Sequence, residues 1–252
     1  MGIYDVNGNN LTASVRKGKK LSILGDSIST YSGYLPSGNA VFYPRYDVQD
    51  VNSTWWKKLI DATGMALEVN NSWSGSRITT TGSTEAAGCM TRCQNLGENP
   101  DIIIVWMGIN DFNNEVALGT YDGKGTFPSA TNTFREAYAV MLNKILTAYK
   151  RSEVWVCTLP YDEMNGEVGF PEKNDSGVLL SDYNVAIKDL ANLFGVNILD
   201  LSKCGLTYQN MDVFMGDYSA ENNTGLHPNL AGHSLIANYA ISKIDPSNTE
   251  RY

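Results

Sequence analysis

Short apolar runs alternate with longer stretches of helical periodicity along this chain of 252 residues. The apolar runs predict strands near residues 20–24, 67–70, 101–107, 153–159 and 196–200. Apolar side chains at helical spacing predict helices near residues 54–63, 84–95, 131–150, 179–194 and 229–244. Because strands that alternate with helices form parallel β-α units, the pattern predicts an α/β fold, a flavodoxin-like three-layer α/β/α sandwich with a parallel sheet of about five strands.

The chain divides into a short N-terminal part and one domain. Residues 1–19 contain the turn signal Asn7-Gly8 and are expected to form an added arm or hairpin. Residues 20–252 are long enough for a single α/β domain with its own core. Long connections inside a compact domain are usually functional, so four of them are expected to rim a site. They are residues 30–53, 112–130, 160–178 and 201–226.

A serine follows the first predicted strand in the turn Gly25-Asp26-Ser27. A serine hydroxyl is a poor nucleophile until a base takes its proton, and the chain has two histidines. His227 precedes the last predicted helix, and the pattern places Pro228 at its first position, where the helix dipole would keep the imidazole neutral. His233 falls inside that helix and is expected to be packed or on the surface.

Two further loops follow predicted strands and carry glycine and amide groups. One contains Gly75, and the other is Gly108-Ile109-Asn110-Asp111. Ligand sites in open parallel sheets form outside the carboxyl ends of the strands. A backbone N–H at a glycine and an asparagine amide are donors that suit an oxyanion hole.

These blocks, in this order, make the chain resemble the SGNH or GDSL-type serine hydrolases. The resemblance rests on Gly25-Asp26-Ser27, Gly75, the Gly108–Asp111 block and His227-Pro228, and it spans roughly residues 20 to 244. It implies ester hydrolysis through an acyl-enzyme, with Ser27 as nucleophile and His227 as base. The implied oxyanion donors are the N–H groups of Ser27 and Gly75 and the Asn110 amide.

One position departs from the family pattern, which usually has aspartate three residues before the histidine. Thr224 stands there in this chain. Three outcomes stay open: a Ser-His dyad steadied by a backbone carbonyl or Thr224, an aspartate supplied by Asp212 or Asp217, or lost activity. We expect a working dyad or a substitute acceptor.

Aromatic residues gather around the predicted site and favour a carbohydrate substrate. Trp73 is the strongest candidate for a sugar subsite, whereas at least one of Trp55 and Trp56 is expected in the core. Arg77 is predicted either to engage a carboxylate or to cap its loop. Asp26 and Asp111 are candidate substrate contacts, although bracing of turns is the stronger interpretation.

The net charge of −8, with scattered basic residues, argues against nucleic acid and against an anionic membrane surface as partners. No apolar run has the length of a membrane span, so we expect a soluble protein. Its compartment stays open, including a secreted or periplasmic one with the leader absent from this numbering. The four cysteines, Cys157 in an apolar run among them, are expected to be free thiols. No metal or cofactor is expected.

The sequence thus predicts a serine esterase that hydrolyses small acyl esters, acetyl above all, on carbohydrate. Acyl transfer to a sugar in place of water is a variant of this hypothesis. One alternative is a glycan-binding module on a decayed hydrolase scaffold, motivated by Thr224. Another is a metal-dependent phosphoesterase using Asp26, Asn110, Asp111 and His227.

Overall fold

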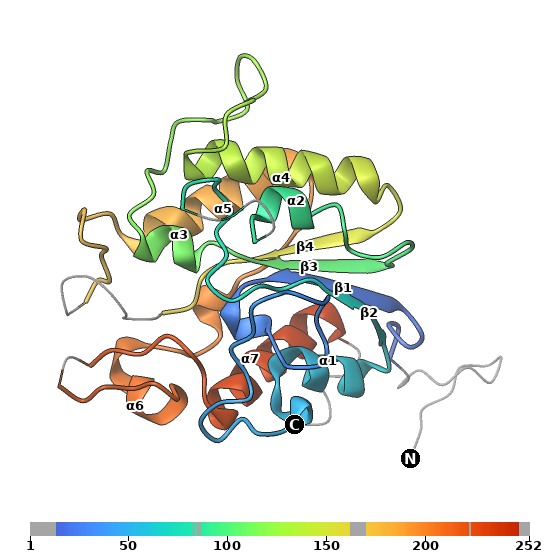
Figure 1. Cartoon of the computed structure of the whole chain (residues 1–252), viewed down its shortest axis with the longest axis vertical. Helices are drawn as coiled ribbons and strands as arrows, with labels where there is room; N and C mark the ends of the chain where they lie inside the picture. Colours follow the sequence, from blue (N-terminus) through green and yellow to red (C-terminus); the bar gives the residue numbers. More distant parts are fainter. Residues whose placement is uncertain (1–13, 83, 85–86, 162–169, 222, 247–252) are drawn as a thin grey trace.

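A five-stranded, all-parallel sheet forms the middle layer of the protein (Figure 1). The computed structural model describes residues 14–82, 84, 87–161, 170–221 and 223–246. The strands are β1 (Lys20–Gly25), β2 (Ala66–Asn70), β3 (Ile102–Trp106), β4 (Glu153–Cys157) and β5 (Asn197–Leu199). Their order in the sheet is β2-β1-β3-β4-β5, which is the flavodoxin-like order.

This order places the three motif-bearing strands side by side. β1 lies between β2 and β3, and the chain changes direction across the sheet at β1. Since the strands are parallel, the loops that follow β1, β2 and β3 leave the sheet at the same edge. This is the switch point where open α/β sheets form ligand sites.

Helices cover both faces of the sheet (Figure 1). The longer ones are α1 (Trp55–Thr63) and α7 (Leu230–Ile244) on one face, and α4 (Phe134–Ala148) and α5 (Leu180–Phe194) on the other. Three short α-helices are α2 (Cys89–Arg92), α3 (Ile109–Asn113) and α6 (Met211–Phe214). Single 3₁₀ turns occur at Ser27–Ser29, Val51–Ser53, Leu201–Lys203 and Tyr208–Asn210. The three-layer α/β/α prediction is therefore confirmed.

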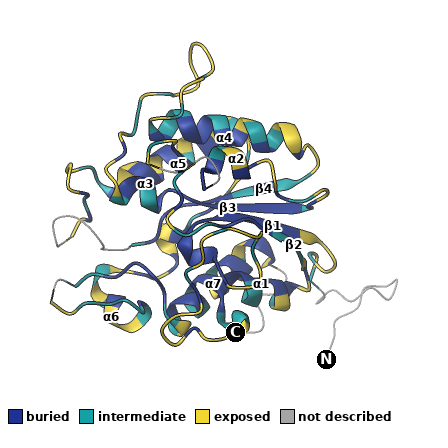
Figure 2. Cartoon of the chain, viewed as in Figure 1, coloured by how far each residue is buried: buried dark blue, intermediate teal, exposed yellow. Residues whose placement is uncertain are grey.

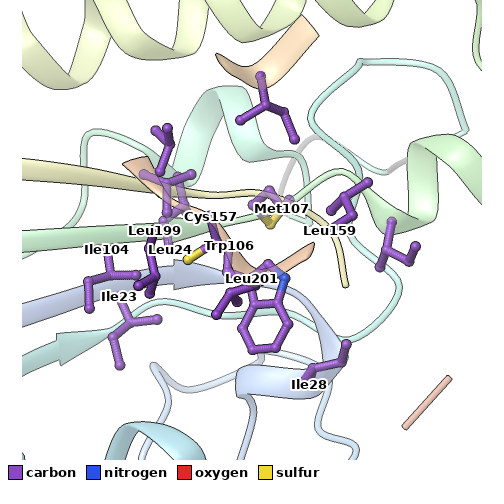
Figure 3. Packing of buried hydrophobic residues seen from close by; sticks show 14 of the residues in the cluster. Ile23, Leu24, Ile28, Ile104, Trp106, Met107, Cys157, Leu159, Leu199 and Leu201 are labelled. Carbon is purple, nitrogen blue, oxygen red and sulfur yellow. The ribbon is translucent and has the colours of Figure 1, made fainter. Parts of the chain in front are cut away.

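The core lies against both faces of the sheet. In Figure 2 the buried residues, in dark blue, include most of β1 and all of β3. Each residue of β3 is at most 1% exposed, as expected for a central strand covered on both sides. Figure 3 shows Ile104 and Trp106 of this strand packed among apolar side chains, with Ile28 of the turn after β1 on the opposite side of the cluster from Ile104. Trp55 and Trp56 are both fully buried, so the pair belongs to the core.

Several predicted boundaries were wrong. The helix expected at 84–95 is reduced to α2, with residues 83, 85 and 86 outside the described residues. The block after β3 is not a loop, because α3 begins at Ile109. Pro228 is not the first residue of α7. Asn229 caps that helix, its side chain accepting the N–H of Gly232 at 2.9 Å, so His227 lies in the preceding loop.

The predicted arm can be followed only in part. Residues 1–13, including the Asn7-Gly8 signal, lie outside the described residues. Arg16 ties the described part to the domain through its hydrogen bond to the Ile244 carbonyl and its ion pair with Glu153. In the described part of the chain, no helix is both long enough and apolar enough to span a membrane.

Candidate active site

Ser27 lies at the first position of a 3₁₀ turn directly after β1, and it is 3% exposed. Asp26 caps this turn, its carboxylate accepting the N–H of Ile28 at 3.1 Å. Gly25 is required by close packing, because a Cβ there would lie 2.7 Å from the side chains of Ser29 and Ser72. The glycine thus lets the loop after β2 approach the turn that carries Ser27.

His227 reaches the same edge of the sheet from the loop before α7. Its Nε2 lies 2.9 Å from Ser27 Oγ, and its Nδ1 lies 2.7 Å from Asp217 Oδ2. An ionised carboxylate only accepts hydrogen bonds, so the proton sits on Nδ1 and Nε2 can accept the serine proton. The three side chains therefore form a hydrogen-bonded series from serine to imidazole to carboxylate.

The Asp217 carboxylate is held by its second oxygen as well. Oδ1 accepts the backbone N–H groups of Leu226 and His227, both at 2.9 Å. Burial opposes its ionisation, but the hydrogen bonds from His227 and these amides outweigh burial and lower the pKa of Asp217. Asp217 is accordingly ionised at neutral pH and fixed in orientation.

The other predicted partners of the imidazole lie elsewhere. Thr224 forms an antiparallel bridge with Ser219, with backbone hydrogen bonds of 2.8 and 3.2 Å. Asp212 lies in α6 and lines a hollow with Tyr208 and Asn223. Of the partners that the sequence left open, Asp217 is the one whose carboxylate contacts His227 Nδ1, at 2.7 Å, so the substitute acceptor fits the structure and the dyad held by Thr224 does not.

The predicted oxyanion donors lie in the segments that follow β1, β2 and β3. Gly75 has a φ of +79°, a left-handed conformation that glycine adopts without strain, and a Cβ at this position would point into open space. Asn110 lies in the first turn of α3 and donates one amide hydrogen to the Ser76 carbonyl at 3.0 Å. This bond orients the Asn110 amide, whose second hydrogen is still available to a ligand.

Arg92, which was not among the residues predicted from the sequence, braces these segments. The side chain is buried, and its guanidinium donates to the carbonyls of Asn71 and Ala87 and to Ser76 Oγ. Asn71 and Ser76 flank Gly75, so the arginine fixes both sides of that loop. The sequence did carry a signal for this role: Arg92 is a charged residue within the apolar helical stretch before β3.

Asp26 and Asp111 brace turns and do not line the surface. Both are fully buried. Asp111 accepts the N–H groups of Ile78 and Thr79 at 2.8 and 3.0 Å. Burial raises the pKa of Asp26 to about 7, although the N–H of Ile28 lowers it. Burial likewise raises the pKa of Asp111 to about 6, although the N–H groups of Ile78 and Thr79 lower it. The bracing of turns that the sequence favoured therefore fits both side chains, and their weaker candidacy as substrate contacts is corrected.

These contacts also bear on the phosphoesterase alternative. The carboxylates of Asp26 and Asp111 are directed to backbone N–H groups, and His227 is directed to Ser27 and Asp217. Across residues that the structure describes, no three His, Cys, Asp or Glu side chains gather as metal ligands.

The remaining candidate substrate contacts differ in what surrounds their side chains. Trp73 is half-buried beside Gly75 and stays a candidate for a subsite. Arg77 caps its own loop, because its guanidinium donates to the Thr81 carbonyl at 3.0 Å and packs over Gly82. Of the aromatics in the connection 30–53, Tyr34 and Tyr46 are exposed.

The second histidine is fully buried. His233 Nδ1 accepts the N–H of Trp55 at 3.2 Å, and burial lowers the pKa of His233 to about 3. It is therefore a neutral core residue. The four cysteines, all buried, are free thiols as predicted.

A flavodoxin-like sandwich whose switch point carries a Ser-His-Asp series defines a site of the serine hydrolase type. Sequence comparison agrees with that class. Residues 19–198 match the GDSL-like Lipase/Acylhydrolase family, and the chain belongs to it. The matched segment contains Ser27, Gly75 and Asn110 and ends before Asp217. Family membership supports a hydrolase that acts on esters.

Solved structures share the fold over most of their length. A protein described as a GDSL-like lipase from Bacteroides ovatus is 28% identical, with a TM-score of 0.67, over 90% of this chain and 98% of that one. Another, from Bacteroides uniformis, is 26% identical, with a TM-score of 0.68, over 91% and 96%. An acetyl xylan esterase, AlAXEase, is 18% identical, with a TM-score of 0.57, over 89% and 99%, and shows likeness of fold alone. The comparison with curated proteins found no match.

Proposed function

We propose that this protein is a serine esterase that removes small acyl groups, acetyl above all, from carbohydrate alcohols. The observation that carries the proposal is the hydrogen-bonded series Ser27–His227–Asp217, with distances of 2.9 and 2.7 Å between its members. In this proposal Ser27 is the nucleophile, His227 the general base and then acid, and Asp217 the group that holds the imidazole.

The proposed reaction has two halves. Ser27 Oγ attacks the ester carbonyl carbon while His227 Nε2 takes its proton. The tetrahedral intermediate then breaks its bond to the alcohol oxygen, which receives that proton from His227 and leaves. Water, deprotonated by the same nitrogen, attacks the acyl-enzyme and releases the acid, and the proton returns to Ser27 Oγ.

The negative charge that develops on the carbonyl oxygen needs donors already in place. We assign this role to the N–H groups of Ser27 and Gly75 and the Asn110 amide. The hydrogen bond from Asn110 to the Ser76 carbonyl and the contact of Arg92 with Ser76 support the assignment, because they fix the amide and the Gly75 loop. Fixed donors stabilise developing charge without reorganising during the reaction.

The carbohydrate part of the proposal rests on Trp73, which is half-buried and whose backbone N–H donates to the Gly25 carbonyl at 3.1 Å, two residues before Ser27. An aromatic face suits the C–H face of a sugar ring, and the polar neighbours suit its hydroxyl groups. The fold likeness to a protein described as an acetyl xylan esterase is consistent with this choice. The glycan-binding alternative was motivated by the lack of a carboxylate at Thr224, and it loses that motivation because Asp217 supplies a carboxylate 2.7 Å from His227 Nδ1.

The test measures turnover of p-nitrophenyl esters of increasing chain length and acetate release from acetylated xylan. We expect acetate to be the best acyl group and xylan to be deacetylated, with both activities lost in Ser27→Ala. A preference for long acyl chains would contradict the substrate assignment. Full activity in Ser27→Ala would contradict the reaction.

A further inference from the structure

The imidazole of His227 is covered on one face by the ring of Phe42. The two ring centroids are 3.5 Å apart and the planes differ by 10°, so the rings are stacked face to face. Phe42 is half-buried and comes from the long connection between β1 and α1. None of the hydrogen bonds of His227 involves this residue, and its contact is with the plane of the ring alone.

The segment that carries Phe42 is fastened on both sides of the site. The Phe42 N–H donates to Thr30 Oγ1 at 2.9 Å, and the same hydroxyl donates to the Ser27 carbonyl at 2.8 Å. The next residue, Tyr43, donates its hydroxyl to the Pro228 carbonyl at 2.7 Å. Phe42 is thus tied to the turn that holds Ser27 and to the loop that holds His227.

Arg45 also contacts the Phe42 ring. Its guanidinium carbon lies over the ring, 4.7 Å from the centroid. A cation over an aromatic face is attracted to it. The Phe42 ring therefore has two stabilising neighbours, Arg45 and the imidazole of His227.

Rotation about the Cβ–Cγ bond of His227 would swing Nε2 out of line with Ser27 Oγ and Nδ1 out of line with Asp217 Oδ2. A flat ring stacked on the face of the imidazole opposes that rotation, because the turning ring would run into it. We propose that Phe42 is a positioning residue that fixes the ring plane of His227, so that Nε2 stays aimed at Ser27 Oγ. This inference rests on the proposed function of the Ser27–His227–Asp217 series.

The test compares Phe42→Leu, which keeps an apolar cover but no plane, with Phe42→Tyr, which keeps the plane. A small misplacement of reacting groups costs about tenfold to a hundredfold in rate. We expect Phe42→Leu to lower kcat for p-nitrophenyl acetate by about tenfold or more, with KM within about twofold, and Phe42→Tyr to retain kcat within about twofold.

Phe127→Leu is the matched control. Phe127 is 42% exposed and packs against Phe194, the last residue of α5, near the start of β5 and hence at the opposite edge of the sheet. It should retain wild-type kcat and KM. Thermal unfolding of each variant checks folding, and Phe42→Met replaces Phe42→Leu if the latter does not fold.

Three results would overturn the proposal: unchanged kcat in Phe42→Leu, a change in KM alone, or an equal loss in Phe42→Tyr. Any of them can occur while the wild type shows turnover that depends on Ser27. Failure of this inference is therefore distinct from failure of the proposed esterase, in which the wild type itself would show no such turnover.

Discussion

Replacement of Asp217 by asparagine should nearly abolish activity, for a reason that the hydrogen bonds specify. Oδ1 of Asp217 accepts two backbone N–H groups, so an asparagine carbonyl oxygen must take that position. Its NH₂ group then faces His227 Nδ1 at the place of Oδ2. The imidazole must accept there, which moves its proton to Nε2. A protonated Nε2 cannot take the proton of Ser27.

A wrong tautomer of this kind costs about 10⁴-fold in kcat, equivalent to about 5.4 kcal/mol of transition-state stabilisation. The assay is hydrolysis of p-nitrophenyl acetate by Asp217→Asn, with thermal unfolding to confirm the fold. Asp212→Asn is the matched control, since Asp212 lies in α6 away from the imidazole, and it should keep wild-type activity. Activity of Asp217→Asn within about tenfold of wild type would refute the reasoning, as would equal inactivation by Asp212→Asn.

Three further predictions concern the oxyanion donor, a buried carboxyl group and metal dependence. Asn110→Ala should lower kcat by about 10² to 10³ with little change in KM, because the amide binds charge that develops only in the transition state. A pure rise in KM would place Asn110 in ground-state binding. Burial raises the pKa of Asp26 to about 7 from 3.8, so its stabilising effect is complete below about pH 4 and is lost as pH rises through about 7. The free energy of unfolding of Asp26→Asn, measured with urea, should therefore increasingly exceed that of wild type over this range, and a constant difference would contradict the pKa shift. Excess EDTA should leave the esterase rate unchanged, whereas loss restored by added divalent metal would favour metal-assisted chemistry.

The layers and the position of the site were predictable from local patterns. The run Ile102–Trp106 is apolar throughout because the strand is covered on both faces, and such runs mark strands without knowledge of the fold. Gly25-Asp26-Ser27 was recognisable because the turn after β1 is built from adjacent residues. In a parallel sheet, strand ends meet at one edge, so the blocks after β1, β2 and β3 could be placed together.

The acid and the bracing residues depended on contacts between distant parts of the chain. Asp217 meets His227 because the connecting loop folds back on itself, with antiparallel bridges between Met215 and Pro228 and between Ser219 and Thr224. Spacing along the sequence does not encode that reversal, so Asp212 and Asp217 were equivalent candidates. The first residue of α7 was also predicted wrongly. Both Pro228, as a first helical residue, and Asn229, as a capping residue, are start signals, and the helix uses Asn229.

The central claim is that Ser27 is a nucleophile activated by His227, and covalent labelling tests it most directly. A fluorophosphonate probe incubated with the wild-type protein, followed by peptide mass spectrometry, should place the label on Ser27. Ser27→Ala should take up no label, and His227→Ala should react far more slowly while still folded. Labelling of Ser27→Ala at the wild-type rate, or a folded wild-type protein that takes up no label, would contradict the account.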